Sequence, residues 1–177
     1  MEIIKLLALL IGSALLFACC AAHPEPNLSY QNRAFRAHVV CESGDFTFGA
    51  IFTSLPKEPD SARDISLEFT FPDTLCGIKV EKREEKVTVY LDEVEISAPH
   101  AVSWLSLSEL FDIEATVKDS SVETLDGQKL NFINAVSDDG REFSLYLYPA
   151  SGLPRRISGE INGKPSTLEV ISFEFIQ

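Results

Sequence analysis

Residues 34–53, "AFRAHVVCESGDFTFGAIFT", decide the fold because apolar side chains recur there at every second position. Phe35 and Ala37 share one face of the first half, and Phe48 and Phe52 share one face of the second half. A period of two is typical of a β-strand with one buried face. The short Gly-Asp connection between the halves predicts a β-hairpin.

The same period continues along the chain. Further strands are predicted for "DISLEFTFP" (64–72), "CGIKVEK" (76–82), "KVTVYLDEV" (86–94), "SVETL" (121–125), "KLNFINAVS" (129–137), "EFSLYLYP" (142–149), "PRRISGEI" (154–161) and "STLEVISFEFI" (166–176). Asp126-Gly127 and Asn162-Gly163 are pairs that accept the positive φ of tight hairpins. The alternation changes parity in the last strand, which predicts a bulge near Val170.

One segment has the pattern of a helix. "SLSELFDI" (106–113) begins with Ser106 and has Glu109 three residues later, which is a capping box. Leu107, Leu110 and Phe111 form an apolar stripe after Trp104. The predicted fold class is therefore mainly β with one short helix (α+β): a curved antiparallel sheet forms an incomplete barrel, and the helix lies on its concave face.

The N-terminus has the features of a secretory signal peptide. Residues 6–17 carry no charge, and twelve residues are too few for a membrane-spanning helix, which needs roughly 20. Leu16-Phe17-Ala18-Cys19 resembles the lipobox of bacterial lipoproteins, in which the cysteine receives diacylglycerol. We expect a signal peptide over 1–18, lipidated Cys19 with a flexible tether over 19–33, and one domain over 34–177. The alternative is an ordinary signal peptide with an incidental cysteine pair.

The net charge and the cysteines restrict the classes of function that the protein can have. A net charge of −12 argues against binding to nucleic acid, which requires many Lys and Arg residues. A lipidated protein would lie on the extracytoplasmic face of the bacterial cell membrane. In that oxidising compartment Cys41 and Cys76 can form a disulfide, although two free thiols would give the same sequence. Neither cysteine has neighbouring ligands at zinc spacing, so no metal is expected.

Motifs of catalysis are missing from the sequence. It contains no Gly-x-Ser-x-Gly, no His-Glu-x-x-His and no phosphate-binding glycine loop. His23, His38 and His100 are scattered, and we expect them to be surface residues. The sequence therefore predicts a protein that is not an enzyme and needs no cofactor.

The order of the parts is similar to that of a known superfamily. Strands containing "LEFTFP" (67–72) and "GIKVEKREEKVTVYL" (77–91) precede "LSLSELF" (105–111), and "YLYPASGLPRRISGEINGK" (146–164) follows. This order resembles the bacterial lipoprotein-carrier superfamily of the LolA and LolB type. The resemblance implies an incomplete barrel whose inner face holds lipid. The family usually has an amphipathic helix before the first strand, and "PNLSYQNRA" (26–34) is short and polar.

The phenylalanines provide the physical basis for a lipid site. Many fall on the expected concave side, where either a ligand or the chain's own Trp104, Leu107, Leu110 and Phe111 can cover them. The candidate ligand-binding residues are Phe46, Phe48, Phe52, Phe69, Phe71, Val89, Leu107, Phe111, Phe132 and Phe143. We predict a lipid-anchored protein that binds or transfers an amphiphile: an acyl chain, a lipid or a lipoprotein. The alternative is an envelope protein–protein interaction module with a filled core.

Overall fold

The computed structural model describes residues 28–55, 63–84, 86–101, 105–106, 108–111, 115–137 and 140–176. The strands are β1 (Phe35–Ser43), β2 (Phe46–Leu55), β3 (Asp64–Phe71), β4 (Ile78–Arg83), β5 (Lys86–Leu91), β6 (Val94–Ser97), β7 (Ala115–Leu125), β8 (Gln128–Ser137), β9 (Glu142–Leu147), β10 (Pro154–Ile161) and β11 (Lys164–Phe175). The helical elements are the 3-10 turns η1 (Ser29–Asn32) and η2 (Pro99–Ala101) and the helix α3 (Ser108–Phe111), and Leu105 is helical as well.

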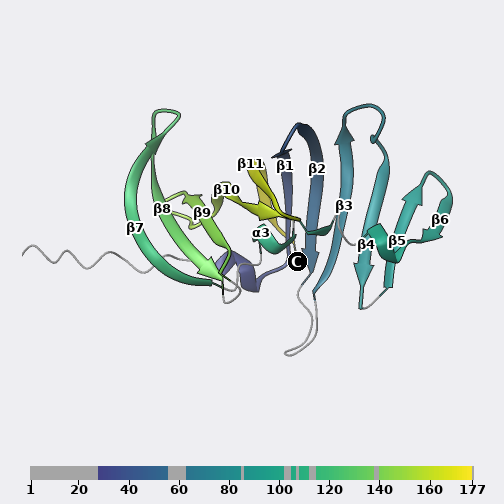
Figure 1. Ribbon diagram of the computed structural model, residues 1–177, viewed down its shortest axis with the longest axis horizontal. Coiled ribbons are helices and arrows are strands. Elements are labelled where there is room, and N and C mark those ends of the chain that lie inside the picture. Colours follow the sequence, from purple (N-terminus) through teal and green to yellow (C-terminus); the bar gives the residue numbers. More distant parts are fainter. Residues whose placement is uncertain are drawn as a thin grey trace, which may run out of the picture.

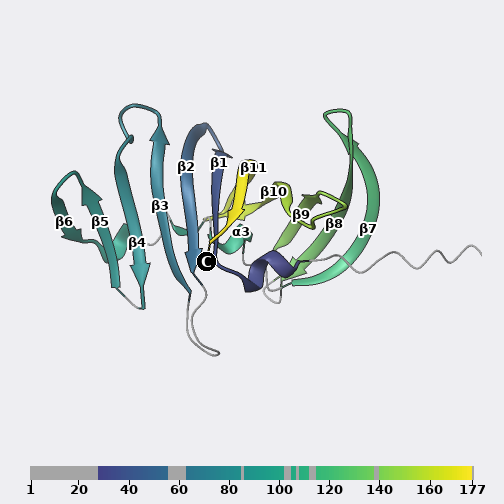
Figure 2. The same ribbon diagram turned by 180° about the vertical axis from the view of Figure 1, so that it is seen from behind.

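The strands form one antiparallel sheet of eleven in the order β6-β5-β4-β3-β2-β1-β11-β10-β9-β8-β7. Two meanders, β1 to β6 and β7 to β11, are joined where β1 pairs with β11. Strands β6 and β7 therefore lie at opposite edges of the sheet (Figures 1 and 2).

Tight turns connect the hairpins that the sequence predicts. Asp126 and Gly127 have φ of 50° and 79°, and Asn162 and Gly163 have φ of 51° and 76°. Both positions of a type I′ turn require positive φ, which explains the choice of Asp-Gly and Asn-Gly. These turns set the register of β7 with β8 and of β10 with β11.

The predicted bulge in the last strand is confirmed. His38 lies opposite Ser172, but its neighbour Val39 lies opposite Val170, so Ile171 is an extra residue in β11. The extra residue keeps the apolar side chains on both sides of the bulge on the same face of the sheet: Leu168 and Val170 before it and Phe173 after it all pack in the core.

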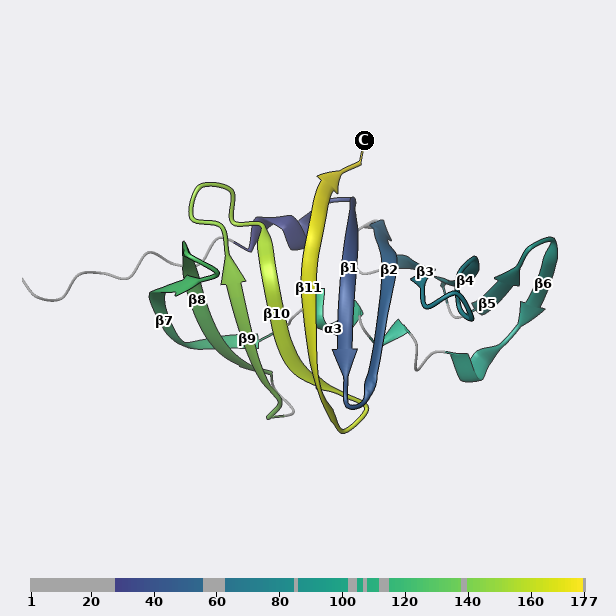
Figure 3. The same ribbon diagram turned by 90° about the horizontal axis from the view of Figure 1, so that it is seen from above.

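The sheet is curved (Figure 3). Its two faces differ in the chemistry of their side chains. We define the concave face by rows of facing apolar residues such as Phe52, Leu67 and Val80. We define the convex face by rows such as Glu169, Arg156 and Tyr146. The chain that connects β6 to β7 joins the two edges of the sheet, and we call its described residues, 98–101, 105–106 and 108–111, the crossing segment.

The predicted α+β class, an incomplete barrel with a helix on its concave face, is wrong. The described residues form an open, nearly all-β sheet, and α3 is a single turn rather than the predicted helix. So short a helix has too few internal hydrogen bonds to persist without other contacts. The Ser106 hydroxyl, expected to cap the helix, donates to Asn162 Oδ1 at 3.5 Å.

One strand of the structure has no counterpart in the sequence-based prediction. The sequence predicts a single strand over residues 86–94, whereas Asp92, with φ of 51°, turns the chain and β6 begins at Val94. Asp92-Glu93 lacks the glycine that marks turns such as Asp126-Gly127 and Asn162-Gly163, so the hairpin has a weak signal in the sequence.

Candidate functional site

Uninterrupted apolar rows cross the concave face. Phe52 faces Leu67, and Leu67 faces Val80, across β2, β3 and β4. On the other half of the sheet the facing residues in β11, β10, β9 and β8 are Leu168, Ile157, Leu145 and Ile133. All of these side chains are buried. The concave face therefore contributes a continuous apolar layer to the core over most of the sheet.

An aromatic cluster closes the centre of this face. The Phe111 ring stacks on Phe52 with centroids 4.8 Å apart and an interplanar angle of 6°, and it lies 5.4 Å from the Phe35 ring. Phe35 stacks on Phe173 at 4.7 Å, and Tyr30 of η1 packs edge-on against both. Rings from both ends of the described chain and from α3 thus meet at one place, which we call the central aromatic cluster.

Hydrogen bonding and a small residue hold the crossing segment against the sheet. The Gln31 side-chain amide donates to the Phe111 carbonyl at 3.0 Å. At Gly159 in β10, a Cβ atom would lie 2.9 Å from Leu110 Cδ2 and 2.8 Å from Phe143 Cδ1. Since real Cβ contacts are not that short, glycine is what allows Leu110 and Phe143 to approach β10. The buried Leu105, Leu110 and Phe111 cover the centre as a result.

The end of the concave face toward β6 is less covered. Leu91 faces Ile78 and Val94, and Ile96 faces Val89, so all five belong to the concave side. Leu91, Val94 and Ile96 are 47%, 55% and 50% exposed. They continue the row of the buried Val80, which faces Val89. We call Ile78, Val89, Leu91, Val94 and Ile96 the open apolar end.

A second exposed apolar region lies near the β1–β2 turn and includes an aromatic ring. The Phe46 ring, half exposed, is 5.6 Å from the Phe48 ring, and Phe48 is 5.3 Å from the ring of the buried Phe69. These three rings form a continuous apolar path from solvent to the core.

The convex face has a groove lined by both polar and apolar side chains. The groove has a volume of about 370 Å³ and lies over β1 to β4; its lining includes Arg36, Thr53 and Ser66. Glu81, buried on this face, is held by Lys79 at 2.5 Å and by Arg83 at 3.2 Å. Positive and negative side chains are thus paired within the groove, and no single class of ligand is indicated by its charge.

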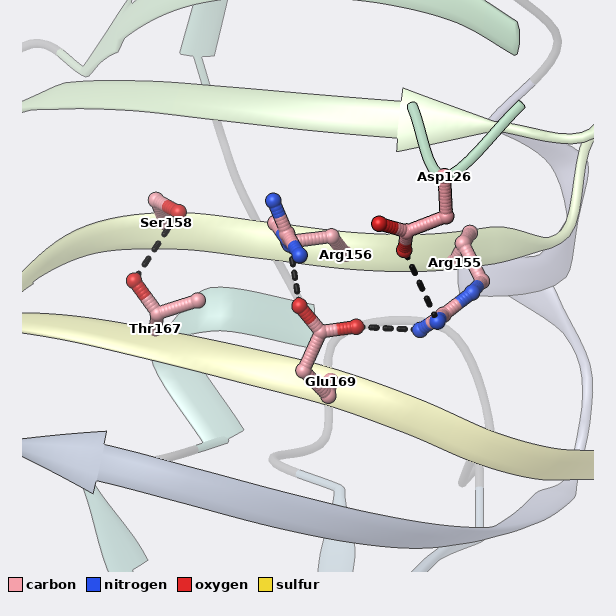
Figure 4. A network of polar contacts seen from close by, with 6 residues as sticks. All are labelled: Asp126, Arg155, Arg156, Ser158, Thr167 and Glu169. Carbon is pink, nitrogen blue, oxygen red and sulfur yellow. Dashed lines mark hydrogen bonds and ion pairs between the residues drawn. The ribbon is translucent and has the colours of Figure 1, made fainter. Parts of the chain in front are cut away.

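A second polar cluster joins β10 and β11 on the convex face (Figure 4). Glu169 accepts hydrogen bonds from Arg155 and Arg156, one on each carboxylate oxygen, and Arg155 also pairs with Asp126 at 3.4 Å. Beside it, the Tyr146 hydroxyl donates to Glu123 at 3.0 Å. Burial, followed by this hydrogen bond and by the charge of Glu123, raises the pKa of Tyr146, and Arg156 opposes the shift. Every charge in the cluster is paired, as expected of contacts that join strands.

The structure distributes the predicted ligand-binding residues unevenly. Phe48, Phe52, Phe69, Phe111 and Phe143 are buried on the concave side, and Val89 is half-buried there. Phe46 is half exposed, and Phe71 lies at the end of β3 with its ring over Gly49. Leu107 lies outside the described residues. Phe132 differs from the expectation, since it faces Tyr146 on the convex side and packs on that ring at 5.1 Å. Ligand binding by these residues stays a prediction.

The expected disulfide is not formed in the structure. Cys41 is a buried free thiol on β1, and Cys76 is an exposed free thiol in the loop after β3. Burial, with a smaller contribution from Glu42, raises the pKa of Cys41 to about 12. The predicted pairing placed the two cysteines together, but the alternation of β1 turns Cys41 into the core.

Residues 1–27, with the predicted signal peptide and Cys19, lie outside the described part of the chain. Within that part, no group of His, Cys, Asp and Glu side chains could hold a metal ion. No helix among the described residues is long and apolar enough to span a membrane.

Comparison with known proteins identifies the fold. No protein-family profile and no curated protein matches the chain. Among solved structures, an uncharacterized conserved protein from Thermus thermophilus is 18% identical, with 85% of this chain and 86% of that one covered and a TM-score of 0.51. A LolA superfamily protein from Nitrosomonas europaea is 12% identical, with coverages of 82% and 87% and a TM-score of 0.39. The chain therefore shares its fold with the Thermus thermophilus protein.

A further neighbour is the Mycobacterium tuberculosis lipoprotein LppX, which is 12% identical, with 84% of this chain and 96% of that one covered and a TM-score of 0.43. The solved structures that are similar to this chain thus include a member of the LolA superfamily, which the sequence resembles. Because one fold hosts many functions and these identities are below 25%, the comparisons establish no ligand, partner or activity for this chain.

Proposed function

We propose that this is a lipid-anchored extracytoplasmic protein that binds the apolar chain of an amphiphile on the concave face of its sheet. The observation that carries the proposal is the open apolar end, where Leu91, Val94 and Ile96 are about half exposed and continue the buried rows of the core. A surface that is apolar, partly uncovered and joined to a core can accept an acyl chain without exposing new backbone.

The size of the open apolar end suits part of an acyl chain. Its rows run from β6 to β4, and strands lie about 4.8 Å apart, so the surface extends for roughly 10 Å across the sheet. Each methylene removed from water contributes about 0.8 kcal/mol. A chain of about eight methylenes would therefore gain roughly 6 kcal/mol on this surface before the entropic costs of binding. Longer chains would have to enter beneath the crossing segment.

The location of the protein follows from its predicted anchor. A diacylated Cys19 would keep the domain at the extracytoplasmic membrane surface, because two acyl chains hold far more firmly than one. Replacing Cys19 with Ala should release the protein from membranes and end the incorporation of radiolabelled palmitate. Persistent labelling that maps to Cys20 would contradict the choice of Cys19.

Lipid binding is tested on the mature chain purified without detergent. Native mass spectrometry should show a bound lipid, and a fluorescent fatty acid should bind in competition with it. Ile96→Asp should weaken fatty-acid binding at least tenfold. Ile171→Asp is the matched control, because Ile171 is 58% exposed against 50% for Ile96 but lies at the bulge of β11, away from the open apolar end.

Two outcomes would refute the lipid site. One is a clean apo mass together with no fatty-acid binding. The other is equal loss of binding in both aspartate variants, which would place the ligand elsewhere. Both variants should keep the circular dichroism spectrum of the wild type, since both positions are exposed.

A second candidate function is an envelope protein–protein interaction module with a filled core. The central aromatic cluster favours it, because Phe111 and Phe35 occupy the space where a carrier would hold lipid. In that case the chain binds no fatty acid, and its partner contacts the outside of the sheet. Neither candidate includes a catalytic step or a cofactor.

A further inference from the structure

Among the described residues, no strand pairs with the outer side of β6. β6 pairs with β5, and it is the last strand of the described sheet on that side. The Ala98 amide donates to the Val87 carbonyl at 3.0 Å. Because backbone groups alternate in direction along an antiparallel strand, those of Ile96 and Val94 also face β5. The N–H and C=O groups of Glu95 and Ser97 therefore point away from the sheet.

The side chains of β6 divide by chemistry between its two faces. Val94 and Ile96 belong to the concave side, where they are exposed. Glu95 lies on the opposite side and pairs with Lys86 at 3.4 Å. Asp92 and Glu93, both exposed, add two negative charges at the adjoining turn. The edge thus offers apolar side chains on one face and a net negative charge on the other.

The opposite edge of the sheet is protected, and β6 is not protected in the same way. β7 contains a bulge between Val117 and Asp119, and Lys118 pairs with Glu142 at 3.7 Å. Bulges and charges are common devices that keep an edge from pairing with other chains. Strand β6 has only two features that discourage pairing with another chain: it is four residues long, and it carries the single charge of Glu95.

We infer that the β6 edge accepts an extended segment of a partner protein in which apolar and basic side chains alternate. The segment would add a twelfth strand, hydrogen-bonded to the outward backbone groups of Glu95 and Ser97. Its apolar side chains would lie beside Val94 and Ile96, and its basic side chains beside Glu95 and the acidic turn. Charge complementarity favours a basic partner over a second copy of this chain. In a dimer through this edge, the same acidic residues of two chains, each with a net charge of −12, would lie opposite one another.

The experiment uses the full mature chain and a labelled synthetic peptide, acetyl-KVKIKVK-amide, in a fluorescence anisotropy titration at low salt. The peptide should bind, and added salt should weaken it, because exposed charge pairs are screened. The acidic peptide EVEIEVE should bind at least tenfold more weakly. Equal binding of the two peptides would overturn the assignment of a basic partner.

Two variants locate the site. Ser97→Pro removes the outward N–H of β6 without removing a bond to β5, and it should weaken peptide binding at least tenfold. Glu95→Lys should also weaken it at least tenfold. The matched control for the charge is Glu174→Lys, because Glu174 is similarly exposed and also forms a salt bridge on the convex face, with Arg36 at 3.6 Å. Wild-type affinity in the Ser97→Pro variant would overturn strand addition at this edge.

The readouts separate this inference from the lipid site. Ser97→Pro should leave fatty-acid binding unchanged, whereas Ile96→Asp should reduce it. Analytical ultracentrifugation of the mature chain should show a monomer. A dimer that Ser97→Pro dissociates would show that the edge pairs with a second copy, and it would overturn the basic partner.

Discussion

Replacing Phe111 with Ala should destabilise the protein strongly, because this ring connects the crossing segment to the sheet. Phe111 is buried between Phe52, on which it stacks at 4.8 Å, and Phe35 at 5.4 Å. Truncating a buried phenylalanine removes its transfer free energy and leaves a cavity, which costs about 3–5 kcal/mol. That loss is a large fraction of the roughly 5–15 kcal/mol that stabilises an ordinary domain.

Urea unfolding followed by circular dichroism measures this loss. With a slope of about 2 kcal/mol per molar urea, a loss of about 4 kcal/mol lowers the midpoint by roughly 2 M. A double-mutant cycle with Phe52→Ala should give a coupling energy of about 0.5–1.5 kcal/mol for the stacked pair. Val122→Ala is the control, because Val122 is exposed on β7 and its loss should change stability by less than about 0.5 kcal/mol.

The cycle can refute the packing described above. A cost below about 1 kcal/mol for Phe111→Ala, with no coupling to Phe52, would mean that the crossing segment does not pack on the sheet in solution. The same variant bears on function, because it opens the centre of the concave face. If the central aromatic cluster excludes ligand, fatty-acid binding should rise in the variant that still folds.

Three further outcomes are expected. Gly159→Ala should cost about 1–3 kcal/mol in urea unfolding, because the new methyl group would overlap two packed side chains, and an unchanged midpoint would contradict the close approach. Iodoacetamide at pH 8 should modify the exposed Cys76 and spare the buried Cys41 in the native protein, and rapid labelling of both thiols would show that Cys41 is not buried. Because the pKa of Cys41 is raised to about 12, the stability that its buried thiol contributes is complete below about pH 9 and is lost as the pH rises toward 12. Glu169→Gln should cost about 1–3 kcal/mol, because it weakens the charged hydrogen bonds of two half-buried arginines, and a wild-type midpoint in urea would show that the cluster contributes nothing.

The candidate site was only partly predictable from the sequence. Alternation placed Phe48, Phe52 and Phe69 on one face, and the structure agrees. Phe132 follows the same local pattern in a strand with apolar residues of both parities, so the sequence could not tell which set faces inward. The open apolar end was missed because it depends on β6, whose turn has no glycine.

The sequence by itself determined most of the strands, most of their turns and the bulge in β11, because these depend on side-chain alternation and on backbone preferences of single residues or pairs. Only the tertiary structure decided that Ser108–Phe111 is a single turn, that Cys41 and Cys76 lie apart, and which apolar side chains the crossing segment covers. Each of these depends on packing between residues far apart in the chain, and no local pattern records such contacts. The exposure of the open apolar end also depends on tertiary structure, because it is determined by which other segments pack against β5 and β6.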